Sequence, residues 1–205
     1  MKTPSSFNRN NFRKERAFIL SSYQERRVEI LTRLQEFRHV DPDLYFYELA
    51  YCLLTPQSSA RNAAQVVNRL IEQNFAKTDF DPAPVLRSRQ HYVRFHNAKS
   101  KYLRNMKRLF PEIHALLLSK KSCSAAEIRS WLVDNVKGLG MKEATHFLRN
   151  IGRNDGLAIL DRHIIRELQK LGVVRRLPKS LTPKNYLALE NEFIRFSEEI
   201  GIPVD

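Results

Sequence analysis

Apolar residues recur at intervals of three and four along nearly the whole chain, and this spacing constrains the fold more than any other feature. Glycine is scarce, with six among 205 residues, and no run alternates between apolar and polar residues as a strand would. After Asp41, for example, one predicted helix face carries Leu44, Tyr47, Tyr51 and Leu54. Each such stripe must be buried against other helices. The sequence therefore predicts an all-α fold of about eight to ten helices.

Helix starts can be recognised from their capping residues. Asp41-Pro42 and Thr182-Pro183 each predict an N-cap residue followed by proline in the first turn. Ser124 and Glu127 have the spacing of a capping box. With boundaries near Asp41 and Asp155, we expect a middle helical lobe over 41–155 and a terminal helical lobe formed by 1–40 and 156–205.

The charge of the chain favours a polyanionic partner. It carries 35 lysines and arginines against 22 acidic residues, a formal net charge of +13. Such an excess suits DNA, RNA or an acidic membrane face, although a basic surface without a partner is the alternative. The segment Met1 to Arg16 is polar and basic, so it predicts an arm and not a signal peptide. No apolar stretch approaches the roughly 20 residues that span a bilayer. We therefore expect a cytoplasmic protein that does not bind membranes.

The cysteines limit the metal chemistry of the chain. There are two, Cys52 and Cys123, too few for a four-thiolate zinc or iron–sulfur site. A disulfide between them is not expected without a secretory signature. We predict neither a metal nor another cofactor.

The segment from Val136 to Ala144 predicts two helices joined by a tight hairpin. One helix ends, Gly138 and Gly140 flank Leu139, and the next helix starts at once. Glycine permits backbone angles that other residues resist, and the free amides at a helix N-terminus bind anions. We expect Leu139 to point inward, while Lys137 and both glycines contact DNA phosphate. A plain corner between two helices is the alternative.

Two residues near this hairpin are candidates for chemistry. Lys142 lies in the first helical turn, where the positive end of the helix dipole disfavours a charged ammonium. A nucleophilic amine must be uncharged, so the position suits a nucleophile, with a simple phosphate contact as the alternative. Asp161 follows the apolar run 157–160 and should cap a helix. Its second carboxylate oxygen could still hold a lysine, a water or a developing sugar cation.

Taken together, these segments resemble the helix–hairpin–helix DNA glycosylase superfamily, and most closely its type 2 8-oxoguanine DNA glycosylase/AP lyase family. The resemblance spans roughly Leu44 to Leu171. The segments that carry it are Lys137–Ala144, His146–Gly152 and Asp161–Ile164, with weaker support from Leu53–Ser58 and Arg94–Lys99.

The resemblance implies a bifunctional base-excision repair enzyme with a DNA-binding cleft between its two lobes. Such an enzyme removes an oxidised purine, 8-oxoguanine, from double-stranded DNA and nicks the strand by β-elimination. Lys142 would attack the sugar C1′ with assistance from Asp161, and Gln57 would enter the duplex where the base has left. Phe95 would stack on the flipped base, unless it is an ordinary core aromatic. Lys99, on a basic helix, would contact DNA. We expect a monomer associated with the nucleoid.

Two alternatives and two departures from the family pattern accompany this interpretation. A monofunctional glycosylase would use Asp161 to assist water, and a non-catalytic module would only bind DNA shape. The chain lacks the four-cysteine cluster of the endonuclease III branch, which agrees with the type 2 family. Relatives usually continue beyond a segment such as Gly201–Asp205 with a tryptophan-containing helix and a terminal lysine that recognise 8-oxoguanine. Either the chain is truncated or its lesion recognition differs.

Overall fold

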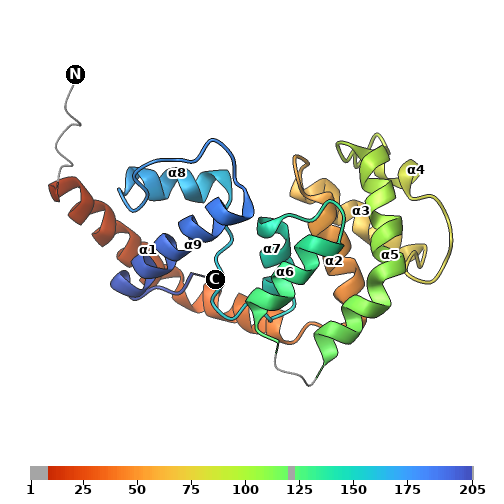
Figure 1. Cartoon of the computed structure of the whole chain (residues 1–205), viewed down its shortest axis with the longest axis horizontal. Helices are drawn as coiled ribbons and strands as arrows, with labels where there is room; N and C mark the ends of the chain where they lie inside the picture. Colours follow the sequence, from red (N-terminus) through yellow and green to blue (C-terminus); the bar gives the residue numbers. More distant parts are fainter. Residues whose placement is uncertain (1–8, 120–122, 205) are drawn as a thin grey trace. The chain divides into compact units, whose positions relative to one another are not determined.

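The computed structural model describes residues 9–119 and 123–204, and within these ranges the chain is helical and contains no strand. This confirms the predicted all-α fold (Figure 1). The helices are α1 (Arg9–Arg38), η1 (Pro42–Leu44), α2 (Tyr45–Leu54), α3 (Ala60–Glu72), α4 (Ala83–Leu86), α5 (His96–Leu118), α6 (Ala125–Asn135), α7 (Met141–Asn150), α8 (Arg162–Lys170) and α9 (Pro183–Ile200). None of those helices is long and apolar enough to cross a membrane.

Contacts along the chain divide it into two compact units. One consists of Met1–Glu36 with Gly156–Asp205, and the other of Phe37–Asp155. The lobe boundaries expected from the sequence, and the DNA-binding cleft between the lobes, stay predictions.

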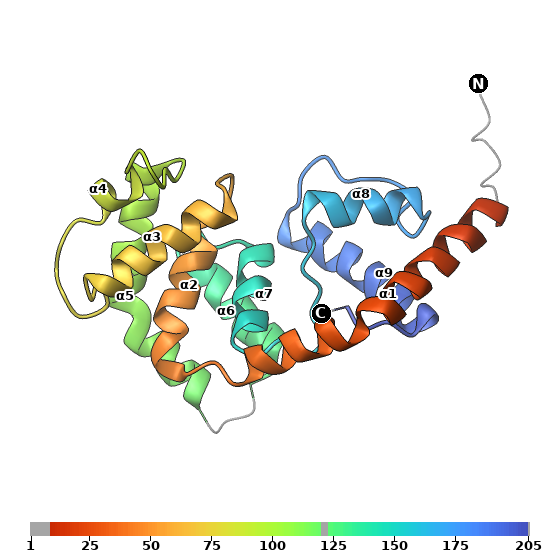
Figure 2. The ribbon, with the colours of Figure 1, turned by 180° about the vertical axis from the view of Figure 1, so that it is seen from behind.

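In the unit Phe37–Asp155, helix α2 packs against α3, α5 and α7 (Figure 2). The expected cap at Asp41 is present, where its side chain accepts a hydrogen bond from the Asp43 amide. Ser59 caps α3, and Ser124 and Glu127 form the predicted capping box of α6. Helix α5 runs through Pro111 and ends at Leu118.

The buried face of α2 differs from the expected one. Leu44 is 44% exposed and lies in η1, whereas Tyr47 and Tyr51 are half-buried. The residues of α2 that are buried are Phe46, Leu49, Ala50, Cys52, Leu53 and Leu54. The reason is that three neighbouring helices cover α2, so no single three-and-four stripe describes its core side.

The other unit contains most of α1 together with α8 and α9. Helix α9 begins at Pro183 after the predicted Thr182 cap and buries Tyr186, Leu189, Phe196 and Ile200. Arg16 of α1 forms an ion pair with Glu199 of α9 at 2.7 Å. Because α1 already begins at Arg9, the second half of the expected basic arm is helix; Met1 to Asn8 lie outside the described residues.

Candidate active site

The hairpin between α6 and α7 has the predicted form. Helix α6 ends at Asn135, and the Leu139 amide donates a hydrogen bond to the Val136 carbonyl at 3.1 Å. Leu139 is 5% exposed, which confirms that it points inward and joins the turn to the core. Helix α7 begins directly after Gly140. The first-turn amides of such a helix have no acceptor within the helix and lie at the positive end of its dipole.

The two glycines of the hairpin have different reasons to be there. Gly138 has φ +92°, and a Cβ added to it would lie 2.3 Å from Cδ2 of Tyr102. Only glycine satisfies both conditions. Gly140 has φ −98°, which any residue adopts, and its added Cβ would meet only Glu143 Oε2 at 3.0 Å. The expected need for backbone freedom therefore holds at Gly138 and not at Gly140. Lys137 is exposed beside them.

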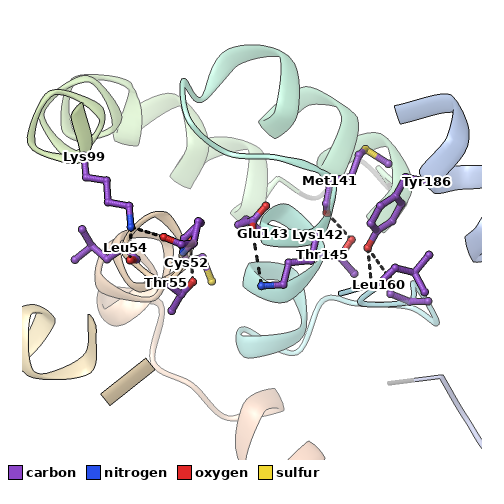
Figure 3. A network of polar contacts seen from close by, with 12 residues as sticks. Cys52, Leu54, Thr55, Lys99, Met141, Lys142, Glu143, Thr145, Leu160 and Tyr186 are labelled. Carbon is purple, nitrogen blue, oxygen red and sulfur yellow. Dashed lines mark hydrogen bonds and ion pairs between the residues drawn. The ribbon is translucent and has the colours of Figure 1, made fainter. Parts of the chain in front are cut away.

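Lys142 lies in the first turn of α7 and is partly accessible. Its side chain is 31% exposed, and its Nζ is 3.6 Å from Oε1 of Glu143. Figure 3 shows the side chain beside the N-terminal turn of α7, with Cys52 of α2 nearby. Burial raises the pKa of the Cys52 thiol, and Lys142 opposes this increase. The thiol beside Lys142 is thus uncharged at neutral pH.

His146 lies one turn after Lys142 on the same helix, a spacing that puts two side chains on one face. Burial, with smaller contributions from Arg149 and Lys142, lowers the pKa of His146 to about 4. Its ring is 6.0 Å from that of Tyr51, and its buried Nδ1 has no hydrogen-bond partner. His146 is therefore neutral at physiological pH.

Four of the sequence-predicted site residues meet at one pocket of about 250 Å³. The pocket is lined by Leu53, Pro56, Gln57, Phe95, Ala98, Lys99, Tyr102 and Gly138. Gln57 is exposed at the turn after α2. Phe95 is 53% exposed, so it is not a core aromatic, and the Arg94 guanidinium lies 5.4 Å from its ring centroid. Segments far apart in the sequence thus bring the Gln57 side chain, the Phe95 ring and Gly138 of the hairpin together.

Lys99 lines this pocket, but its side chain is buried, which the sequence did not indicate. It is 4% exposed, and its Nζ donates hydrogen bonds to the Leu54 and Pro56 carbonyls at 2.7 Å each (Figure 3). Ser58 Oγ is its third acceptor, at 3.2 Å. These bonds use the ammonium within the protein, on the turn that carries Gln57, and the expected contact of Lys99 with DNA stays a prediction.

Asp161 belongs to the other unit and is the predicted N-cap of α8. Its Oδ1 accepts hydrogen bonds from the His163 and Ile164 amides, both at 2.8 Å. The backbone before it is fixed by Tyr186, whose hydroxyl donates to the Ala158 carbonyl at 2.7 Å and accepts from the Leu160 amide at 3.0 Å. The cap uses one carboxylate oxygen and leaves the other for a ligand.

Cys52 and Cys123 are free thiols. Among the residues that the structure describes, no group of three or more histidine, cysteine or acidic side chains could hold a metal ion.

Four residues around these positions were not identified from the sequence. Tyr102 follows Lys99 by three residues on α5, and Glu143 and His146 follow Lys142 by one and four on α7. Helical spacing could have indicated Tyr102 and His146, whereas Glu143 is only the next residue in the sequence. Nothing local could have indicated Cys52, because it comes from a different helix, α2.

Comparison with known proteins gives one consistent family. A family model described as 8-oxoguanine DNA glycosylase matches residues 30–202. The 8-oxoguanine DNA glycosylase/AP lyase of Fusobacterium nucleatum is 39% identical over 191 residues, covering 89% of this chain and 87% of that protein. That of Sulfurisphaera tokodaii is 32% identical over 181 residues, covering 87% and 86%.

Solved structures similar to this chain come from the same family. The 8-oxoguanine DNA glycosylase of Thermotoga maritima superimposes with a TM-score of 0.80 at 26% identity, covering 94% of this chain and 91% of that one. The 8-oxoguanine glycosylase/lyase of Methanocaldococcus jannaschii, in complex with a 15mer DNA containing 8-oxoguanine, gives a TM-score of 0.78 at 28% identity, with 91% of each chain covered.

Proposed function

Because this chain belongs to the 8-oxoguanine DNA glycosylase family, we propose that it excises 8-oxoguanine with Lys142 as nucleophile and Asp161 as the assisting carboxylate. The protein is a base-excision repair enzyme, a DNA glycosylase that is also an AP lyase, and its substrate is DNA. The residues that perform the two reactions are inferred from their surroundings.

One observation carries the assignment of Lys142. Lys142 lies in the first turn of the helix that follows the hairpin and is partly exposed. The groups near it include the uncharged Cys52 thiol and the uncharged His146 imidazole. Its charged neighbour on α7 is Glu143, at 3.6 Å. Its partial exposure beside the hairpin supports the role of nucleophile, because the amine can reach a nucleotide whose backbone is held there.

DNA would be held by its backbone at the hairpin. The first-turn amides of α7 and the exposed Lys137 offer donors to a phosphate, and the net charge of +13 attracts the duplex. The damaged nucleotide must then leave the stack, because its glycosidic bond is inaccessible inside the duplex. Exposed Phe95 would stack on the flipped base, and exposed Gln57 would fill the gap.

The chemistry follows from the amine and the carboxylate. Uncharged Lys142 attacks C1′, the bond from C1′ to the base breaks, and the base leaves with the electron pair and takes up a proton. The C1′–O4′ bond then opens: its electron pair goes to O4′, which takes up a proton and becomes a hydroxyl, while the nitrogen lone pair forms the C1′=N bond of a protonated Schiff base. Loss of a C2′ proton breaks the C3′–O3′ bond and nicks the strand. Water finally hydrolyses the Schiff base and releases Lys142.

Asp161 would stabilise the positive charge that develops on the sugar. Its Oδ1 is occupied by two amides of α8, so Oδ2 would face the sugar. A fixed carboxylate is effective because it needs no reorganisation when the charge appears. The hydroxyl of Tyr186 supports this role, since it holds the backbone before Asp161.

The test is a panel of duplexes, each with one lesion. With 8-oxoguanine opposite cytosine, we expect release of the base and a nick on its 3′ side. Borohydride should trap a covalent complex. Base release without a nick or a trapped complex would support a monofunctional glycosylase instead. Binding without base release from any lesion would support a non-catalytic module.

We further propose that the protein acts as a monomer on nucleoid DNA. A glycosylase of this kind binds one lesion with one active site, and nothing in its chemistry requires a second copy. Sedimentation of the protein bound to a single-lesion duplex should give a complex with one chain. A complex with two chains would overturn this part of the proposal.

A further inference from the structure

The turn that carries Gln57 holds this residue in a disfavoured conformation. The Ser58 amide donates a hydrogen bond to the Thr55 carbonyl at 3.0 Å, so Pro56 and Gln57 occupy the centre of a β-turn. Gln57 has φ +55°. The left-handed region is disfavoured about five- to thirtyfold for a residue other than glycine. Proline in the second position and positive φ in the third define a type II turn, which prefers glycine or asparagine where Gln57 stands.

The peptide group between Pro56 and Gln57 decides which turn forms. Type I and type II turns differ mainly in the orientation of this central peptide, and in type I the third residue has negative φ. Lys99 Nζ donates a hydrogen bond to the Pro56 carbonyl, the oxygen of this peptide, at 2.7 Å. The contact favours the orientation that requires positive φ at Gln57. Without it, the turn is free to relax and the Gln57 side chain changes direction.

The Lys99 ammonium has one acceptor for each of its N–H donors. It has three N–H groups, and it faces three oxygens: the carbonyls of Leu54 and Pro56 and the hydroxyl of Ser58. A lysine that is 4% exposed is unusual unless it is paired in this way. Burial lowers the pKa of Lys99 to about 8, so the ammonium is still mostly charged at neutral pH.

Ser58, one of the acceptors of the Lys99 ammonium, also contacts the segment that carries Phe95. Ser58 Oγ also accepts a hydrogen bond from the Arg94 amide at 3.0 Å. Phe95 follows directly, itself with φ +60°. The Gln57 turn and the start of α5 are thus joined through one hydroxyl beside the Lys99 ammonium.

We propose that Lys99 is a positioning residue for base excision, which fixes the Pro56–Gln57 peptide and so holds Gln57 in the conformation that enters the duplex. The inference rests on the role given to Gln57 in the proposed function. It assigns Lys99 an action through Gln57 and not through a contact of its own with DNA.

A double-mutant cycle tests this. Single-turnover excision of 8-oxoguanine and the affinity for undamaged duplex are measured for Lys99→Met, Gln57→Ala and the double variant. We expect Lys99→Met to slow excision about tenfold, the size of the conformational preference that it releases, with less than about twofold change in affinity. In the Gln57→Ala background, Lys99→Met should cause no further slowing, because the residue through which it acts is absent.

Two further variants separate positioning from general damage to α5. Lys107→Met removes another α5 lysine that donates to a loop carbonyl, that of Thr78, and its effect on excision should be the same with and without Gln57→Ala. Ser58→Ala is milder toward the ammonium than Lys99→Met, since it removes one acceptor and leaves both carbonyls, but it also removes the acceptor of the Arg94 amide. It should slow excision less than Lys99→Met does, and its effect should be smaller in the Gln57→Ala background, where only the contact with the Arg94 amide still matters. This comparison keeps the test decisive if Lys99→Met does not fold.

The outcomes are distinct. Equal slowing by Lys99→Met in both backgrounds, or no slowing by either Lys99→Met or Ser58→Ala, would overturn the positioning role and leave the role of Gln57 intact. Wild-type excision by Gln57→Ala alone would overturn the role of Gln57 in the proposed function, and the inference with it.

Discussion

Replacing Gly138 with alanine should destabilise the protein strongly. Gly138 has φ +92°, and a non-glycine residue in such a conformation costs about 1–3 kcal/mol. The added Cβ would also lie 2.3 Å from Cδ2 of Tyr102, so the ring must move, and overpacking of this kind costs about 1–3 kcal/mol. Together these effects predict a loss of about 2–6 kcal/mol, a large part of the stability of a typical domain.

Gly140→Ala is the matched control, two residues away in the same hairpin. Its φ of −98° suits alanine, and its Cβ would meet only the flexible end of Glu143 at 3.0 Å. We expect a loss below about 1 kcal/mol. A second comparison adds Tyr102→Ala to Gly138→Ala. Removing the ring relieves the overlap but not the backbone strain, so the Gly138→Ala cost should fall by about half without disappearing.

The assay is urea unfolding of each variant at neutral pH, with the free energies of unfolding compared. The same variants are then titrated with undamaged duplex at several salt concentrations. Gly138→Ala should weaken binding and flatten its salt dependence, because a displaced hairpin loses amide contacts to phosphate. If Gly138→Ala and Gly140→Ala unfold with free energies within about 0.5 kcal/mol of each other, the reasoning about the hairpin is refuted.

Three further predictions concern individual side chains. Gln57→Ala should slow base removal more than it weakens binding to undamaged duplex, because only base removal includes flipping; equal losses would indicate a simple backbone contact. Asp161→Asn should change the free energy of unfolding by about 1 kcal/mol or less, since asparagine also caps helices, yet lower the excision rate about 10²–10³-fold; an unchanged rate would exclude an electrostatic role. Because burial lowers the pKa of His146 to about 4 from the usual 6.5, the unfolded chain binds more protons between these values. The free energy of unfolding should therefore fall as the pH drops from 6.5 to 4, by at most about 3 kcal/mol from this group. In His146→Gln, the free energy of unfolding should fall less between pH 7 and pH 4.5, as measured by urea unfolding at both pH values. An unaltered dependence on pH would contradict the lowered pKa of His146.

Local features of the fold could be predicted because their causes are local. Asp161, Thr182 and the Ser124–Glu127 pair cap the helices expected of them, since a cap needs only residues within one turn. The hairpin formed as expected for the same reason, with Leu139 inside.

Features that depend on distant neighbours were predicted less well. The exposed side of α2 could not be predicted from the spacing of its apolar residues, because α3, α5 and α7 together cover the helix. Lys99 looked like one of several basic residues on a helix, but its acceptors are about 40 residues away in the sequence, in the turn after α2. Phe95 looked equally suited to the core and to the surface, and its left-handed backbone at the start of α5 leaves it exposed.

The identity of the nucleophile is the central claim, and borohydride trapping tests it most directly. Lys142→Gln and, as its control, Lys137→Gln are each incubated with a duplex containing 8-oxoguanine and with one containing an abasic site. Lys137 is the exposed lysine at the other side of the hairpin, so the control removes a charge of equal sign from the same motif. We predict that Lys137→Gln still forms the trapped complex, whereas Lys142→Gln forms none with either duplex and does not nick the strand. A covalent complex between Lys142→Gln and lesion DNA would contradict the account and place the nucleophile at another lysine.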